Sequence, residues 1–484
     1  LSISGDFARR VPLVAPGSRT GGAVRSFEAV AQAAPQATGD AYGTSINGTT
    51  SPENNYVIDG LNTTGVLYGL DTSALPPEFI QEIQVKTGGY EPEYGRATGG
   101  QAIVITKSGG NEFHGDVFLY VTPIEGRRHS VVRTGDVPGN NEKPSPNAAY
   151  LVSNEHQSML AQVGFDLGGY IIKDKLWFFA GYAPEVRRRV WGHEFRDRAT
   201  LEADANFEDP DISENAIYDK QDRLVHYYIA NFTFNISQDH SVRLSANGNP
   251  RKVTGVQAVA FGGDPSTYMG LNTGGAMDYS LNYNGKFAGG LVNLDAILGY
   301  HTESDYVTPL TADEEYNSFS GDSAFNGTPG TGEEAVVVHR YLYDVPGGCS
   351  DPSDAACQYT LYRTGGFGGM NRTAASRFAF KPVLSVFLNN VVGNHVLKLG
   401  GDMERNHVIN QRAFTGGALV DELRRLRAEN AHFQRLHVKS HVTRQLQDRR
   451  AFLESKYRDQ VIQLERDRDR LIDDLVRLQM RSAS

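Results

Sequence analysis

The sequence predicts a mainly β protein with three parts: a small α/β domain, an antiparallel transmembrane β-barrel region of about nine strands, and a long α-helical tail. Three observations lead to this expectation. A glycine-rich segment near residues 80–115 alternates short apolar strands with turns. Strand-like runs with alternately short and long connections follow it. Beyond residue 417 the chain has neither glycine nor proline. The expected boundaries are 1–110, 111–417 and 418–484.

The segment 80–115 carries the most specific pattern in the chain. Ile83 and Val85 alternate with polar neighbours, as in a strand with one buried face. The apolar run 103–105 predicts a second strand. Gly99 and Gly100 lie between them and permit a tight reversal or a close backbone approach. We therefore expect a small sheet whose glycines hold special backbone positions.

This segment resembles the end of the plug domain of TonB-dependent outer-membrane receptors, most closely the Oar-like group. Two further blocks are similar to the same group and occur in its order: SINGTTSPENNYVIDGLN at 45–62 and LGGYIIKDKLWFFAGYAP at 167–184. The plug-motif positions are Glu82, Val85, Tyr94, Gly95, Arg96, Gly99, Gly100 and Lys107. The resemblance covers roughly residues 1–417.

The resemblance implies a transporter of the cell outer membrane rather than an enzyme. Its partners would be outer-membrane lipid, a periplasmic TonB-type energy transducer and an unknown ligand, and the plug would rearrange when the transducer pulls on its N-terminal side. The candidate ligand-binding residues lie in loops at the plug apex: Asn62, Tyr68, Tyr90, Glu91 and Tyr94. Packing of these loops against the barrel wall is the alternative role. Glu82 and Arg96 are expected to form a structural charge pair.

The region 111–417 predicts membrane strands through its alternation and its loops. Val163 and Phe165 face one way and Gln162 and Asp166 the other. Such strands suit either a water-soluble core or a barrel whose apolar face meets lipid. Short turns near 173–175, 238–240, 289–290 and 390–395 alternate with long polar connections, which favours the barrel. The aromatic run 177–179 follows a short turn and is interpreted as an interfacial girdle, with core packing as the alternative.

Several classes of function find no support in the sequence. The net charge of -10 argues against a nucleic-acid partner. We find no phosphate-binding loop, nucleophile elbow or metal-binding motif, so we expect no enzymatic activity, no cofactor and no metal. Cys349 and Cys357 lie in a turn-rich loop, where a local disulfide is the preferred interpretation and two unrelated thiols the alternative.

The tail 418–484 does not follow the family pattern. Apolar residues recur every seven positions in two sets that are out of phase, which predicts an interrupted coiled coil and self-association through 419–478. Because the family's barrels have 22 strands, we expect an incomplete barrel that results from truncation, a gene-model fusion or a real fusion. The alternative function is a non-transporting surface or scaffold protein oligomerised through the tail.

Overall fold

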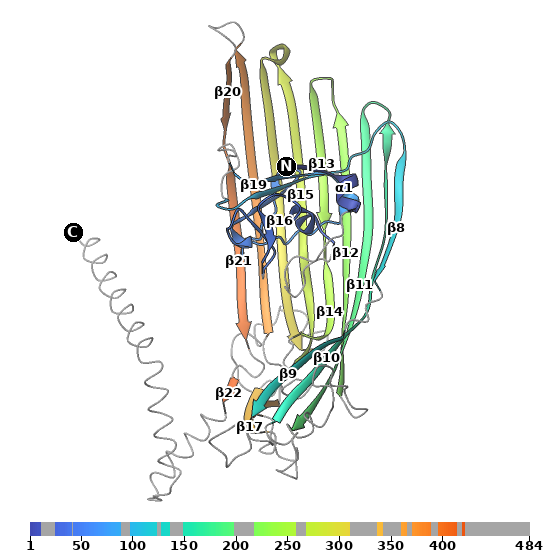
Figure 1. The fold of residues 1–484 in the computed structure, drawn as a ribbon. Coiled ribbons are helices and arrows are strands. Elements are labelled where there is room, and N and C mark those ends of the chain that lie inside the picture. The colour runs from blue at the N-terminus through green and yellow to red at the C-terminus, as the bar shows by residue number, and fades with distance from the viewer. Residues whose placement is uncertain are drawn as a thin grey trace, which may run out of the picture. The chain divides into compact units, whose positions relative to one another are not determined.

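The fold is shown in Figure 1 as a computed structural model. It describes residues 1–10, 25–40, 42–88, 97–122, 127–135, 149–197, 217–257, 268–309, 336–341, 360–364, 370–388, 395–413 and 419–421. The chain divides into two compact units, Leu1–Asp421 and Glu422–Ser484. All described residues belong to the first unit. Within them, no helix is both long enough and apolar enough to span a membrane.

The first part of the chain forms a small mixed sheet with short helices, as the sequence predicts. Its strand order is β1-β6-β7-β4-β5, with β4 parallel to β7 and the other pairs antiparallel. The strands are β1 (Ser2–Ser4), β4 (Asn55–Ile58), β5 (Leu61–Asn62), β6 (Ile80–Lys86) and β7 (Gln101–Thr106). The other elements are α1 (Gly5–Arg10), α2 (Phe27–Ala31), β2 (Ala37–Gly39), β3 (Thr44–Ile46), η1 (Ser51–Glu53) and η2 (Pro77–Phe79).

A buried carboxylate ties α2 to this small sheet. Glu28 accepts hydrogen bonds from the backbone of Thr44 (2.9 Å) and the hydroxyl of Tyr56 (3.0 Å). Burial and the nearby charge of Glu28 raise the pKa of Tyr56 well above its ordinary value, so the phenol stays a donor. Phe27 packs edge-on against Tyr56 with ring centroids 6.2 Å apart. The apolar side chains of α2 therefore pack around a satisfied polar centre.

The second part is a 12-stranded antiparallel sheet, here called the wall. Nine positions run in the order β20-β19-β16-β15-β13-β12-β11-β10-β8, and β21, β14 and β9 continue three of them. The strands are β8 (His114–Thr122), β9 (Arg127–Gly135), β10 (Ala149–Ile172), β11 (Leu176–Asp197), β12 (Ile217–Asn235), β13 (His240–Gly248), β14 (Arg251–Val256), β15 (Met269–Phe287), β16 (Val292–Pro309), β19 (Met370–Leu388), β20 (His395–Gly400) and β21 (Met403–Ala413).

The wall strands are longer than the alternation predicts. The strand expected at 158–172 begins at Ala149, and the one expected at 176–189 ends at Asp197. The paired ladder of β10 and β11 continues across polar residues, which the sequence pattern assigns to loops. The short turns agree with expectation. Asp174 has φ 63° in one, and Gly289 has φ 66° in another.

The wall is inverted relative to a water-soluble sheet. Its outward side chains are apolar and exposed: Val163 is 49% and Phe165 52% exposed. Its inward side chains are polar and buried: Gln162 is 3% and Asp166 4% exposed. The same alternation holds on β12, β13, β15 and β19. The second interpretation of the sequence, apolar side chains outside and polar side chains inside, is therefore the one that the structure has.

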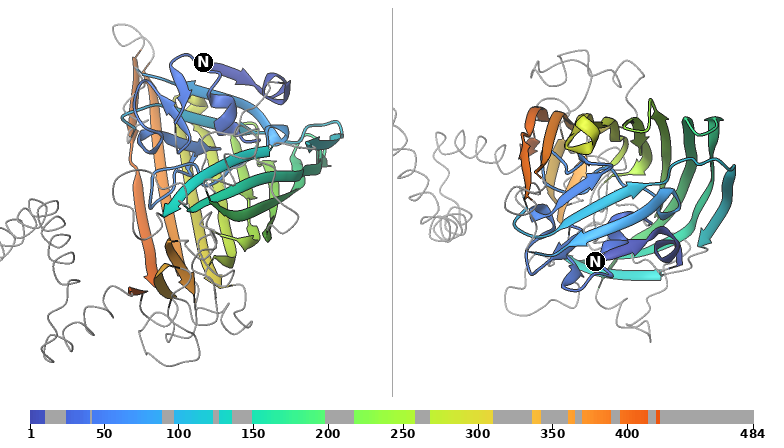
Figure 2. Two further views of the ribbon diagram at one scale, coloured as in Figure 1. Left: turned by 60° about the horizontal axis from the view of Figure 1, so that its bottom comes forward. Right: turned by 90° about the horizontal axis from the view of Figure 1, so that it is seen from above.

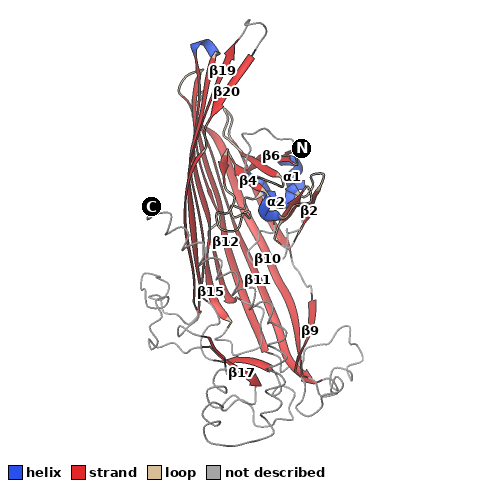
Figure 3. Ribbon diagram, turned by 90° about the vertical axis from the view of Figure 1, so that its left-hand side faces the viewer, coloured by secondary structure: helices blue, strands red, loops and turns tan. Residues whose placement is uncertain are grey.

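The small mixed sheet with its short helices, here called the plug, lies on the polar, concave face of the wall (Figures 2 and 3). One apolar core runs from the plug onto β11 and β12, where Phe179, Val225 and Tyr227 are buried. Phe179 is 1% exposed and belongs to this core. The girdle interpretation is thus wrong for Phe179, because strand alternation turns it inward.

Three short strands lie apart from the wall sheet. The strands β17 (Val336–Tyr341), β18 (Thr360–Thr364) and β22 (Leu419–Asp421) form a small sheet of their own. β22 is parallel to β17, so residues 419–421 are strand rather than the expected start of a helix. The rest of the predicted helical tail, with its predicted self-association, lies outside the described residues.

Gly100 provides a test of the packing inside the plug. A Cβ at Gly100 would lie 2.4 Å from Cγ2 of Ile46, which is fully buried. We expect Gly100→Ala to lower the free energy of unfolding by about 1–3 kcal/mol through overpacking, measured by denaturant titration. Gly88→Ala is the matched control, because its Cβ would have nothing within 4 Å. Equal effects of the two substitutions would contradict the packing argument.

The lowered pKa of Asp40 predicts that the stability of the plug falls at low pH. Burial opposes its ionisation, but hydrogen bonds from Ser51 and from the backbone of Tyr42 and Gly43 outweigh that cost and lower its pKa. Asp40 therefore stabilises the fold above its unfolded pKa and ceases to do so as pH falls through its lower folded pKa. We expect Asp40→Asn to reduce the loss of stability below about pH 4, measured by melting curves from pH 3 to 7. An unchanged pH profile would refute this role.

Candidate functional site at the plug–wall interface

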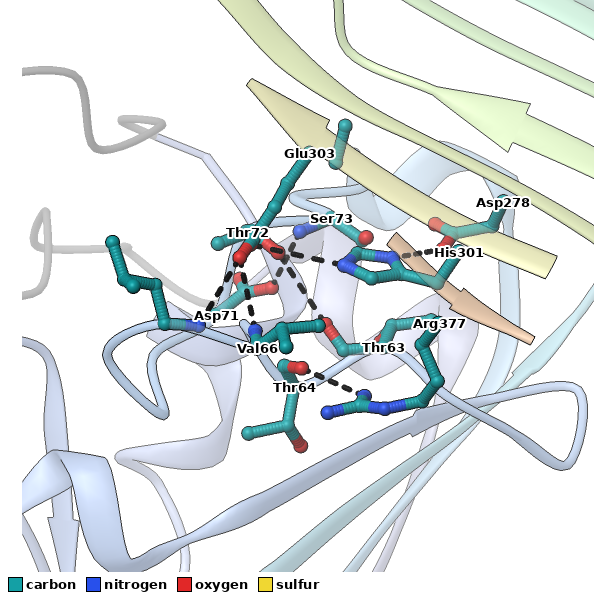
Figure 4. A network of polar contacts seen from close by, with 12 residues as sticks. Thr63, Thr64, Val66, Asp71, Thr72, Ser73, Asp278, His301, Glu303 and Arg377 are labelled. Atoms are coloured by element: carbon teal, nitrogen blue, oxygen red, sulfur yellow. Dashed lines mark hydrogen bonds and ion pairs between the residues drawn. The ribbon is translucent and has the colours of Figure 1, made fainter. Parts of the chain in front are cut away.

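The candidate site is the plug segment 59–73, here called the apex loop, together with the wall residues that hold it. Figure 4 shows its central network. The loop follows β4 and contains β5. It contacts β13, β15, β16, β19 and β21 through polar groups that the wall points inward.

Glu303 on β16 holds the middle of the apex loop. Its Oε1 accepts hydrogen bonds from the backbone N–H groups of Val66 (2.9 Å) and Leu67 (3.4 Å). His301 lies beside it with Nε2 3.7 Å from Oε2 of Glu303. On the other side, Nδ1 of His301 is 2.6 Å from Oδ1 of Asp278. His301 is fully buried and lies between these two carboxylates. Its imidazole therefore separates two groups that would otherwise repel each other inside the wall.

Arg377 on β19 holds the start of the same loop. Its Nη1 donates to the backbone carbonyls of Asn62 (3.1 Å) and Thr64 (2.8 Å). Its Nε forms an ion pair of 3.2 Å with Glu404, and both side chains are more than nine-tenths buried. A guanidinium group presents several donors in a fixed plane, so one arginine can bridge the loop backbone and a wall carboxylate.

A third contact lies nearer the end of the wall at which short turns connect the strands. Asp59 accepts from the backbone of Thr106 (3.0 Å) and forms an ion pair of 3.3 Å with Arg243 on β13. Arg243 also donates to the carbonyl of Thr106 (3.1 Å). Asn231 on β12 donates to the hydroxyl of Thr106 (2.8 Å). The end of β7 and the start of the apex loop are therefore fixed to the wall together.

From this third contact the apex loop runs along the wall, away from the short turns. Arg243 lies three residues from the start of β13 at a short turn. Glu404 pairs in register with Ala379, and Arg412 with Asn371, so Arg412 is farther from the short turn after β19. Asn62 donates to Glu404 (3.4 Å), and Tyr68 accepts from Arg412 (3.0 Å). Tyr68 thus reaches toward the end of the wall that has the long connections.

The structure brings two of the five predicted ligand residues together in this loop. Asn62 is held to the wall through both its side chain and its carbonyl group. Tyr68 is 47% exposed, so much of its ring remains accessible. The other three, Tyr90, Glu91 and Tyr94, lie outside the described residues. The role of all five in binding a ligand stays a prediction.

The plug-motif residues have mostly structural surroundings. Val85 is buried in the plug core, and Glu82 accepts hydrogen bonds from Ser2 (2.5 Å) and Gln84 (3.0 Å). Gly99 and Gly100 leave room for the side chains of Thr49, Asn54 and Ile46. Lys107 forms an ion pair of 3.2 Å with Asp166 on the wall. Gly95 and Arg96, and the predicted disulfide between Cys349 and Cys357, lie outside the described part of the chain.

Sequence reasoning missed the wall residues that hold the loop: Arg243, Asp278, His301, Glu303, Arg377 and Glu404. None belongs to a local motif. The available signal was strand alternation, which places Arg243 on the polar side of β13 but does not say what it contacts. As for metals, no group of three or more histidine, cysteine or acidic side chains suited to an ion occurs in the described ranges.

Comparison with known proteins identifies relatives of this chain. Residues 11–101 match the family model of the TonB-dependent receptor plug domain. The chain is 34% identical over 447 residues to the TonB-dependent transporter Oar of Myxococcus xanthus. This match covers 87% of the chain and 41% of the relative, so the chain spans less than half of the relative's length.

A solved structure shares the fold. The outer-membrane transporter YddB from Escherichia coli aligns with a TM-score of 0.50 and 13% identity, covering 84% of this chain and 48% of that one. At this identity the likeness concerns the arrangement of plug and wall only.

Glu303 allows a direct test of how the apex loop is held. Glu303→Leu removes the acceptor of two backbone N–H groups, which costs about 1–3 kcal/mol when such donors stay buried. We expect faster hydrogen exchange at the amides of Val66 and Leu67. Glu303→Gln keeps an acceptor oxygen and should have a smaller effect.

Arg188→Gln is the surface control for this experiment. The Arg188–Asp222 ion pair measures 2.6 Å, but its side chains are 56% and 49% exposed. Its loss should leave exchange in the apex loop unchanged. If Glu303→Leu also left the exchange of Val66 and Leu67 unchanged, Glu303 would not hold the loop.

Proposed function

Because the chain belongs to the TonB-dependent receptor family, we propose that it forms the plug and part of the barrel wall of an outer-membrane transporter. In this proposal a ligand binds at the apex loop, and an energised periplasmic partner of the TonB type rearranges the plug. The chemistry is binding and movement, with no covalent step.

The inverted polarity of the wall carries this proposal. Exposed apolar side chains cover its outer face, while buried polar side chains line its inner face. Water outside the sheet would make that arrangement unfavourable, because burial of apolar surface drives folding in water. Lipid outside removes the penalty, and strands that pair with their neighbours leave few backbone groups unsatisfied there. The wall is therefore suited to lie in a membrane with the plug on its lumen side.

The contacts of the plug support movement of one part against another. The apex loop is held by buried charged groups from several wall strands. By contrast, the ladder of β1 with β6 is short: it has three register pairs and is extended by two hydrogen bonds between Leu1 and Val85. A force on the N-terminal side of the plug would separate this short ladder before it broke the buried contacts, since local opening starts where fewest interactions must be lost. In this proposal β1 separates from β6 first, while the apex loop remains bound to the wall.

The apex loop supports ligand binding through its backbone-directed anchoring. Glu303 and Arg377 bind its N–H and carbonyl groups, so the hydrogen bond from Arg412 to Tyr68 is one of several contacts that hold the loop, and the exposed ring face of Tyr68 is left accessible. An exposed tyrosine offers an aromatic face and a hydroxyl group to a ligand. We therefore expect Asn62, Tyr68, Tyr90, Glu91 and Tyr94 to contact ligand, with Tyr68 the best placed of the described residues.

An arginine on the outer face tests the membrane location. Leu244 is 49% exposed on β13, so in water Leu244→Arg should be nearly neutral. In a bilayer the same change should cost about 2–4 kcal/mol near the midplane. We expect reduced folding of the full chain into lipid vesicles, measured by protease resistance and by the urea midpoint.

Tyr42→Arg is the matched control, because Tyr42 is 59% exposed on the plug rather than on the wall. It should leave insertion unchanged. If Leu244→Arg inserted as well as the unmodified chain, or if the chain fractionated away from outer membranes in cells, the proposed location would be wrong.

A further inference from the structure

A cluster of charged side chains lies on the outer face of the wall, on β11, β12 and β14. Arg188 and Asp222 are register partners and form an ion pair of 2.6 Å, with side chains 56% and 49% exposed. Lys220 is exposed and precedes Asp222 by two positions on β12. Lys252 on β14 is also exposed and lies opposite Leu224, which follows Asp222 by two positions. Three cations therefore surround one carboxylate, which gives the cluster a net charge of +2.

Alternation along β12 shows that the cluster points away from the plug. Arg223 and Val225 are 6% and 2% exposed and point inward. The even-numbered residues of the same strand therefore point outward, because successive side chains alternate between the two faces of a sheet. Arg188 and Lys252 are register partners of outward residues and so share their face. The cluster thus belongs to the side of the wall that is otherwise apolar.

The outward side chains of β12 become more polar along the strand, away from the short turn. Phe234 and Phe232, near that turn, are 41% and 42% exposed. Tyr228 and His226, which have polar tips, lie farther along, and the charged cluster lies beyond them. A bilayer shows the same order from its hydrocarbon core to its headgroups, and amphipathic side chains occupy the region between the two.

Strand geometry places the cluster at the level of the lipid headgroups. Phe234 is the last outward residue of β12, and Leu224 precedes it by ten positions, which is about 33 Å along an extended strand. Strands of membrane barrels are tilted by about 40°, so this length crosses about 25 Å of membrane, the height of their apolar band. Asp222 and its partner Arg188 lie about 5 Å higher. They are therefore just outside the hydrocarbon, in the polar layer of the membrane.

The chemistry of the cluster selects among the headgroups found at that level. A guanidinium group such as that of Arg188 matches the geometry of a phosphate group, and the flexible side chains of Lys220 and Lys252 can turn their ammonium groups toward the same anion. Each cation near an anionic membrane surface adds to the attraction. With its net charge of +2 the cluster favours a headgroup that is negative overall above a zwitterionic one.

We propose that Arg188, Lys220 and Lys252 form a binding site for the phosphate group of an anionic membrane lipid, in the leaflet on the side of the wall's long connections. The inference rests on the proposed membrane location and adds a particular headgroup chemistry at a particular place. Asp222 holds Arg188 through their ion pair. A lipid bound here fixes the height of β11, β12 and β14 relative to the membrane surface.

Lipid binding by the full chain, folded in a neutral detergent, tests this site. The probe is phosphatidylglycerol, with zwitterionic phosphatidylcholine as the reference, and bound lipid is measured by native mass spectrometry. We expect the unmodified chain to prefer phosphatidylglycerol. The double variant Lys220→Gln with Lys252→Gln should bind it at least about tenfold more weakly, because two of the three cations are lost. Arg10→Gln with Lys86→Gln removes two positive charges from the plug and is the matched control.

Equal losses in the two double variants, or no preference for phosphatidylglycerol, would overturn the proposal. Inorganic phosphate is the second probe, because a free anion has the same phosphate chemistry as the lipid. At the same concentration it should leave the bound lipid in place, and displacement of the lipid would contradict a lipid site. Membrane insertion is measured separately with Leu244→Arg, so a failure here is distinct from a failure of the proposed function.

Asp222→Asn provides a second test, in which the expected change has the opposite sign. The substitution removes the negative charge of the cluster and should tighten the binding of phosphatidylglycerol by about threefold or more. Because the Arg188–Asp222 ion pair is about half exposed, its loss should leave the fold intact. Weaker binding by Asp222→Asn would overturn the proposal even where the lysine double variant folds poorly.

Discussion

The structure depends on one constraint: the inner face of the wall is polar, buried and in need of partners. Water cannot satisfy groups such as Arg377 and Glu404, whose side chains are almost fully covered. The plug supplies the partners, mostly as backbone groups of the apex loop. In return, the wall fixes a loop that has little regular structure of its own. Plug and wall therefore specify each other's conformation. The polar inner face of the wall and the apex loop would each be unstable against an apolar surface.

Strand alternation determined how much of the wall, and of its contacts with the plug, could be predicted from the sequence. Period-two patterning predicts the wall, its short turns and the side of β13 on which Arg243 lies, because alternation is local. It cannot predict strand length where polar residues continue a ladder, as they do between Ala149 and Asp197. Hydrogen bonding to neighbouring strands maintains the strand there, and the sequence of one strand carries no information about its neighbours' register.

The same limit explains the apex loop. The resemblance to a plug predicts that Asn62 and Tyr68 lie in loops at its apex. The carboxylate that binds Val66 is 237 positions away in the chain. No spacing rule links Glu303 to that loop, since the contact exists only after β16 has taken its place in the wall. Residues that bind backbone groups also leave no complementary side-chain pattern for a sequence search to find.

Two different kinds of contact join plug and wall, and their placement has a consequence for movement. On β13 to β21 the apex loop is held by ion pairs and by hydrogen bonds to its backbone. On β8 to β12 the plug meets the wall mainly through the apolar core, but Lys107 also forms an ion pair of 3.2 Å with the buried Asp166 on β10. Buried charge contacts are costly to separate, because each leaves an uncompensated charge. Both sides of the boundary therefore carry contacts that resist separation of the plug from the wall. The ladder of β1 with β6 inside the plug is short by comparison, so rearrangement within the plug is easier than separation of the whole plug from the wall.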